Sequence, residues 1–169
     1  RTSTSARPGS RDALRRVPDG GVWARVQSEA QAALLAGAAQ ALGELERPHV
    51  LTAAGGLSEL PALLGRHGTP PVFDALVGAD ALLHEPDKGA ALSLLASLLA
   101  PRGRLSLAET VASRGSRLNE LLRFGSEEEL GRRVAEAEEA VYAGAHNAVL
   151  NWSPEELTRL LNTYFGQVI

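Results

Sequence analysis

The sequence predicts an α/β fold with a doubly wound, mainly parallel sheet. Short apolar runs alternate with segments of helical periodicity, and the connections between them are too short for separate antiparallel layers. One run, residues 72–78, is apolar almost throughout, which is typical of a strand buried on both faces of a parallel sheet. Right-handed crossovers would place such strands side by side in one sheet. We expect this sheet to be incomplete at both ends.

The first half of the chain contains two predicted strand–helix pairs. In order, these are a strand at residues 22–26, a helix from Ser28 to about Leu45, a strand at residues 49–53 and a short helix at residues 57–64. Ser28 is placed to cap the first helix, and Pro48 stops it from continuing. The Gly55-Gly56 pair closes the second strand.

The second half continues the alternation. After the strand at residues 72–78, the predicted elements are a helix opening at Pro86-Asp87, a strand at residues 105–108, an acidic helix reaching about Ala143 and a final helix from Pro154. The turn Pro101-Arg102-Gly103 is expected to end the first of these helices. Ser126 with Glu129, and Ser153 with Glu156, have the spacing of capping boxes.

Length and composition bound the class of protein. The chain has 169 residues, which suits one domain, here residues 21–169, after a linker or disordered tail at residues 1–20. It has no apolar run of membrane-spanning length and no secretory pattern, so we expect a cytosolic protein without membrane contact. Without cysteine, a metal site is not expected. The chain has no methionine, and we expect it to be a fragment of a larger protein.

The charge distribution indicates one segment of the chain that could bind nucleic acid. The net charge of −3 gives no overall electrostatic signature for DNA or RNA. The first sixteen residues are nevertheless arginine-rich, with Arg1, Arg7, Arg11, Arg15 and Arg16. Nucleic acid therefore stays a partner to consider, bound through this segment or through the parent protein.

Two segments resemble the fourth-strand to fifth-strand region of class I S-adenosylmethionine-dependent methyltransferases. Residues 73–87 begin with an aromatic-Asp pair and continue to His84 and Pro86-Asp87, while residues 98–109 carry a Leu-x-Pro-x-Gly turn before a strand. Arg102 replaces the first of the two glycines of that turn in the family. Residues 22–45 resemble the second strand with its helix, and residues 49–61 resemble the third strand with the Leu-Pro turn after it. The resemblance covers roughly 22–169 and implies a Rossmann-like sheet of the methyltransferase type.

The features with which this family holds its cofactor are missing. Nothing before Val22 offers the glycine-rich loop that comes after the family's first strand. Val26 and Gln27 stand where the family has a carboxylate for the ribose, and Gly56 stands where an acidic residue often lies near the adenine. We therefore expect no bound cofactor and an interaction or regulatory role. The alternative is an active methyltransferase that binds S-adenosylmethionine with a loop outside this chain.

Six residues at strand ends are candidates for a site. Asp80 and His84 come after the strand at residues 72–78, where α/β sheets bind ligands, and are catalytic candidates. The alternative is that Asp80 caps a turn and that His84 is an ordinary loop residue. The candidates for cofactor binding, also at strand ends, are Gly55, Gly56, Gly78 and Ala79. The glycine pair can instead form a tight strand-to-helix turn.

The remaining histidines are interpreted as ordinary. His49, His67 and His146 do not have the spacing of metal ligands, and we predict surface or strand-end positions for them. Trp23 and Trp152 are predicted to anchor the core.

A narrower resemblance concerns the last third of the chain. Residues 109–118, with Glu109-Thr110-Val111 and Ser113-Arg114-Gly115, and residues 141–152 are similar to the methyltransferase-like tail of some cyanobacterial AAA+ ATPases of the replication-associated recombination type. This resemblance implies that the parent is a bacterial ATPase that acts in DNA recombination. The chain itself has no Walker motif, so ATP chemistry would belong to another part of that parent.

Overall fold

The computed structural model describes residues 21–68, 72–144, 147–150 and 152–169. The predicted α/β class is confirmed, because the described residues form helices and two parallel sheets of two strands each. The chain divides into two compact units, residues 1–70 and 71–169. With two strands in each sheet, the doubly wound arrangement stays a prediction. The arginine-rich segment at residues 1–20 and His146 lie outside the described residues.

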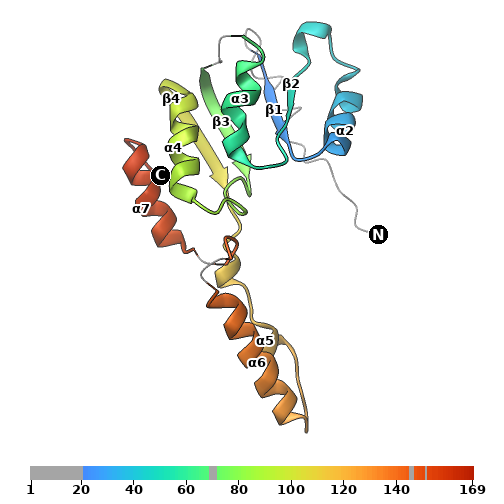
Figure 1. Cartoon of the computed structure of the whole chain (residues 1–169), viewed down its shortest axis with the longest axis vertical. Helices are drawn as coiled ribbons and strands as arrows, with labels where there is room; N and C mark the ends of the chain where they lie inside the picture. The colour runs from blue at the N-terminus through green and yellow to red at the C-terminus, as the bar shows by residue number, and fades with distance from the viewer. Residues whose placement is uncertain (1–20, 69–71, 145–146, 151) are drawn as a thin grey trace. The chain divides into compact units, whose positions relative to one another are not determined.

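The first unit contains a parallel strand pair and the helix that connects the two strands (Figure 1). Strand β1 (Trp23–Val26) pairs with β2 (His49–Thr52) in a register that places Trp23 beside His49. Helix α2 (Glu29–Ala39) packs against both strands. As predicted, Ser28 caps it, with the Gln31 amide donating to Oγ at 3.3 Å.

Helix α2 ends six residues before the predicted Leu45. The chain leaves the helix in tight turns, in which the Leu42 amide donates to the Ala39 carbonyl, and then forms the 3₁₀ helix η1 (Glu44–Glu46). Gly43, with its extended backbone, separates the two helices. Gly43 lies beyond the end of α2, which already includes Gly37, so helix propensity alone does not explain where the helix stops.

The second predicted helix of this unit is present in two parts. A 3₁₀ helix, η2 (Leu57–Glu59), leads into α3 (Leu60–Gly65), with Pro61 in the first turn, where proline is tolerated. The buried apolar residues of the unit come from these helices, from the end of α2 and from β2 with the residue after it: Ala39, Leu51, Ala53, Leu57, Leu60 and Leu64.

The second unit contains the other parallel pair. Strand β3 (Phe73–Ala79) pairs with β4 (Leu99–Ala108), and α4 (Lys88–Leu98) makes the connection and packs against β4. Asp87 caps α4, since the Ala90 amide donates to its Oδ1 at 2.8 Å. Helix α7 (Pro154–Tyr164) packs on α4 (Figure 1).

The predicted turn at residues 101–103 lies inside β4, so the expectation of a strand starting at Leu105 was wrong. Phe73 pairs with Leu99, but Ala75 already pairs with Arg104, so the intervening residues of β4 form a bulge. Gly103 suits this bulge, because a Cβ there would lie 2.9 Å from the Ala100 carbonyl oxygen. A bulge can contain a Pro-x-Gly turn without ending the strand pair.

The two faces of the β3–β4 pair differ in burial. On one face, Leu76, Gly78 and their register partners Leu105 and Leu107 are partly buried. On the other face Phe73 is half-buried, but the residues that follow it in the ladder are exposed, and Val77 is 84% exposed. The prediction that this strand is buried on both faces is therefore wrong for this chain, because the described residues give β3 a single strand partner and one covered face.

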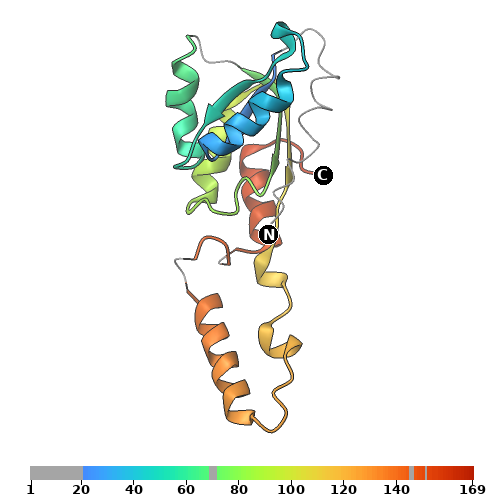
Figure 2. The ribbon, with the colours of Figure 1, turned by 90° about the vertical axis from the view of Figure 1, so that its right-hand side faces the viewer.

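Beyond β4 the chain forms a pair of helices. After the 3₁₀ helix η3 (Ala112–Arg114), α5 (Leu118–Leu121) packs against α6 (Glu128–Tyr142) (Figure 2). The predicted cap at Ser126 is wrong, since α6 begins after Glu127 without a side-chain cap. Glu129, expected to close that capping box, instead forms an ion pair with Arg132 at 2.6 Å.

The lengths and polarity of the helices bear on the expectation that the chain has no contact with a membrane. Within the described ranges, every helix is too short or too polar to cross a bilayer.

Candidate functional site

The six candidate residues fall in both units, so they are described as two groups. Asp80, His84, Gly78 and Ala79 belong to the second unit, at the carboxyl end of β3. Gly55 and Gly56 belong to the first unit and come after β2.

Asp80 forms a tight turn directly after β3. Its backbone has φ 52°, in the left-handed region, which aspartate tolerates better than most residues. Its amide donates to the Ala108 carbonyl at 2.8 Å, and its Oδ1 accepts from the Thr110 amide at 2.9 Å. The carboxylate thus ties the ends of β3 and β4 together.

Glu109 is the residue that sequence reasoning missed at this edge. Its Oε1 accepts from the Ala81 amide at 2.9 Å and from the Leu82 amide at 3.2 Å. Leu82, just after the turn, is fully buried. Burial raises the pKa of Glu109, although the two backbone donors act in the opposite direction. The only sequence signal for it was its position just beyond a strand, where polar side chains converge in α/β sheets.

Lys88, the only lysine of the chain, lies at the start of α4, close to the same turn. Only 8% of it is exposed, and its Nζ donates to the carbonyls of Glu85 at 3.2 Å and Ala148 at 2.8 Å. Nζ also lies 5.3 Å from the ring centroid of Trp152, which is buried as predicted. Burial lowers the pKa of Lys88. The ammonium therefore joins α4 to the segment that leads into α7.

The other candidates of this unit have simple positions. His84 is exposed on the loop between β3 and α4. Gly78 lies where a Cβ would approach the Ala81 Cβ to 2.9 Å and Leu107 Cδ2 to 3.0 Å, so glycine allows the turn to pack on β4. Ala79 pairs with Ala108 at the end of the ladder. Around Asp80, the carboxylates of Asp80 and Glu109 therefore hold the loop after β3 through hydrogen bonds with backbone amides.

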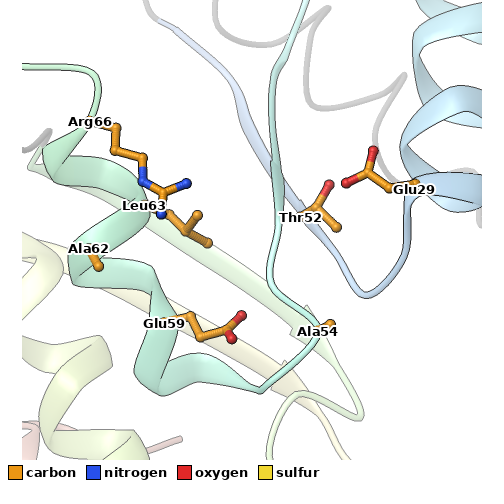
Figure 3. Close-up of a pocket in the computed structure, with 7 residues that line it drawn as sticks. All are labelled: Glu29, Thr52, Ala54, Glu59, Ala62, Leu63 and Arg66. Carbon is orange, nitrogen blue, oxygen red and sulfur yellow. The ribbon is translucent and has the colours of Figure 1, made fainter.

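The first unit has a pocket at the carboxyl end of its strand pair (Figure 3). Its volume is about 480 Å³, within the range of small-molecule sites. The residues that line it come from α2, from β2 with the residues after it, and from η2 and α3: Glu29, Thr52, Ala54, Glu59, Ala62, Leu63 and Arg66. Glu59, Leu63 and Arg66 face Thr52 and Glu29 across it.

The predicted glycine pair borders this pocket. A Cβ on Gly55 would lie 2.5 Å from Glu59 Oε1, so the carboxylate rests against the glycine backbone. Gly56 has φ 104°, a conformation that favours glycine, and this supports the tight-turn interpretation of the pair. Sequence reasoning missed Glu29 and Glu59, because each lies several residues from the strand end at which a carboxylate was sought.

The lining of this pocket combines hydrogen-bond acceptors with apolar side chains. The carboxylates of Glu29 and Glu59 are acceptors of the kind that hold ribose hydroxyls, and Ala62 with Leu63 gives an apolar wall. The described residues around it contain no run of spaced glycines for the amino-acid end of S-adenosylmethionine.

Comparison with known proteins gives no relative: no protein-family model, curated protein or solved structure matches this chain. The methyltransferase and ATPase resemblances therefore stay predictions that rest on the motifs quoted for them.

Proposed function

We propose that this chain is an interaction domain of the doubly wound, methyltransferase-like class, and that its parallel sheet is completed by another part of a larger protein. The proposal rests on the contrast between the apolar composition of β3 and its exposure. Apart from the exposed Asp74, this strand is apolar toward both faces, yet the described residues pair it with β4 alone and leave Val77 exposed.

The contrast between the two strands supports this reading. On the uncovered face, β4 presents Arg104 and Ser106, which suit solvent, whereas β3 presents Ala75 and Val77 beside them. Native edge strands are commonly protected by charged residues or proline, and strands with two apolar faces normally lie inside parallel sheets. The composition of β3 is therefore that of an interior strand, and a further parallel strand on its free side, with its crossover helix over the uncovered face, would satisfy it.

The partner that we propose is the remainder of a parent polypeptide. The resemblance of residues 109–118 and 141–152 to an ATPase appendage favours a AAA+ ATPase of DNA recombination as that parent. In this role the domain regulates or recruits by contact and does not transfer a methyl group.

A pair of matched substitutions tests the proposal. Val77→Lys and Ser106→Lys place the same charge at two exposed, register-paired positions. In this chain alone, each should change the free energy of unfolding by no more than about 0.5 kcal/mol. In the parent, Val77→Lys should cost at least about 2 kcal/mol, because it would bury an unpaired charge. Equal effects of Val77→Lys in the chain and in the parent would refute the proposal.

A second candidate, an active S-adenosylmethionine-dependent methyltransferase, is favoured by the pocket beside Glu29 and Glu59. It requires that the missing glycine-rich loop come from the parent. Calorimetry with S-adenosylmethionine and S-adenosylhomocysteine separates the two candidates. If the parent binds either compound and Glu59→Gln weakens this binding, the result would support the enzyme. If neither the chain nor the parent binds them, the result would support the interaction domain.

A further inference from the structure

Three aromatic rings of the first unit form a cluster at the start of its strand pair. The indole of Trp23 and the imidazole of His49 are stacked, with centroids 4.4 Å apart and planes inclined by 25°. The imidazole of His67 meets the indole edge-on at 5.0 Å. The two imidazole centroids are 6.2 Å apart. Two histidines distant in sequence thus lie against one tryptophan.

The fold explains why the rings meet. Trp23 and His49 begin β1 and β2 and are register partners, so their side chains lie on the same face. His67 comes after α3, and its amide donates to the Leu64 carbonyl at 3.0 Å, which holds it in the turn that ends the helix. Both histidines are exposed residues.

We propose that His49 and His67 together bind a divalent transition-metal ion of the zinc and copper class, next to the indole of Trp23. Metal–nitrogen bonds of about 2.0–2.1 Å place the centroids of two imidazoles on one ion roughly 5 to 6.5 Å apart, depending on the angle at the metal. The separation of 6.2 Å lies in this interval. Small rotations of two exposed side chains bring one nitrogen of each ring onto a common ion.

The coordination would be open. Among the residues that the structure describes, no group of three or more histidine, aspartate or glutamate side chains gathers around a common point. Water or a partner's side chain therefore completes the coordination sphere, which distinguishes this site from a closed structural zinc site. Imidazole suits both zinc and copper, and copper(II) has the higher affinity for such ligands.

Tryptophan fluorescence reports directly on this site. Copper(II) bound beside Trp23 should quench the fluorescence of this residue. Trp152 is the only other tryptophan, so the loss is measured against the constant emission of that one residue. We expect saturable one-to-one quenching of the full chain, reversed by excess zinc chloride. His49→Ala and His67→Ala should each weaken the binding at least about tenfold. His84→Ala, at an exposed histidine of the other unit, should leave it unchanged.

Two further measurements separate metal binding from the fluorescence signal and from misfolding of a variant. In Trp23→Phe the quenching should disappear, while calorimetry with copper(II) still detects one bound ion. Circular dichroism confirms that each variant is folded before it is scored. Non-saturable quenching, or binding that survives either histidine substitution in a folded variant, would overturn the two-histidine site.

Discussion

Arg102 has a backbone φ of 71°, in the left-handed region that favours glycine. Its side chain is exposed at the bulge of β4, and the resembled methyltransferases have glycine at the matching position. Arg102→Gly should therefore stabilise the folded chain by about 0.5 to 1 kcal/mol, because the relief of strain exceeds the added entropy of the unfolded state. Denaturant-induced unfolding measures this difference.

Arg104→Gly is the matched control for that substitution. Arg104 is also an exposed arginine of β4, but it lies in the regular ladder opposite Ala75. Glycine there should destabilise the chain by roughly 0.5 to 1 kcal/mol. Equal effects of the two substitutions would show that the left-handed backbone at residue 102 carries no cost.

Glu109 should make stability depend on pH. Burial raises its pKa above the ordinary value of 4.5, so the folded chain binds this proton more tightly than the unfolded chain. The resulting stabilisation is complete below pH 4.5 and is lost as the pH rises through the raised pKa of the folded state. The free energy of unfolding of the native chain, relative to Glu109→Gln, should therefore fall as the pH increases above 4.5.

Glu128→Gln serves as the control for Glu109, because Glu128 is exposed on α6. It should retain the pH slope of the native chain, whereas Glu109→Gln should flatten it. A rise in the relative stability of the native chain between pH 4.5 and neutrality would contradict the assignment of a raised pKa.

At the residue scale, Asp80 was singled out because it comes directly after a strand, and the structure gives its carboxylate a hydrogen bond from the Thr110 amide after β4. Glu109 was not singled out, because its hydrogen bonds to the Ala81 and Leu82 amides exist only once β4 has paired with β3. His49 and His67 were interpreted as unrelated for the same reason, since strand register and the end of α3 bring them together.

At the element scale, two serines with the same motif spacing behave differently. Ser153 caps α7, with the Glu156 amide donating to its Oγ at 3.2 Å, whereas α6 begins after Glu127 without a side-chain cap. Ser153→Ala should therefore cost about 1 kcal/mol of stability. Ser126→Ala should change it by no more than about 0.5 kcal/mol. Thermal or denaturant unfolding compares the two, and an equal loss in both would restore Ser126 as a cap.

Helix starts were more predictable than helix and strand ends. Ser28, Asp87 and Ser153 each cap the expected helix, because capping depends on a few neighbouring residues. The bulge in β4 depends on its pairing with β3, which local patterns do not contain. Pro101-Arg102-Gly103 was expected to be a turn that ends a helix, but the pairing of Leu99 with Phe73 places it in a bulge within a strand.

At the scale of the whole molecule, the α/β class and the parallel pairing were predictable from the alternation of apolar runs and helices. Each described strand pair is parallel and joins two strands consecutive in the chain, with a helix between them. A single sheet cannot be deduced from that alternation, because which edges meet depends on contacts between segments distant in sequence. The burial of β3 was over-predicted for this reason, since among the described residues β3 pairs with β4 alone.

Residue-resolved hydrogen exchange of β3 tests the central claim most directly. In a strand paired on one side only, alternate amides point toward the partner and the others toward the free edge. Alternate amides of Phe73–Ala79 should therefore exchange rapidly in this chain, and all of them should be protected in the parent protein. Uniform protection of β3 in the chain alone, or rapid exchange of the same amides in the parent, would contradict the claim that a further strand completes this sheet.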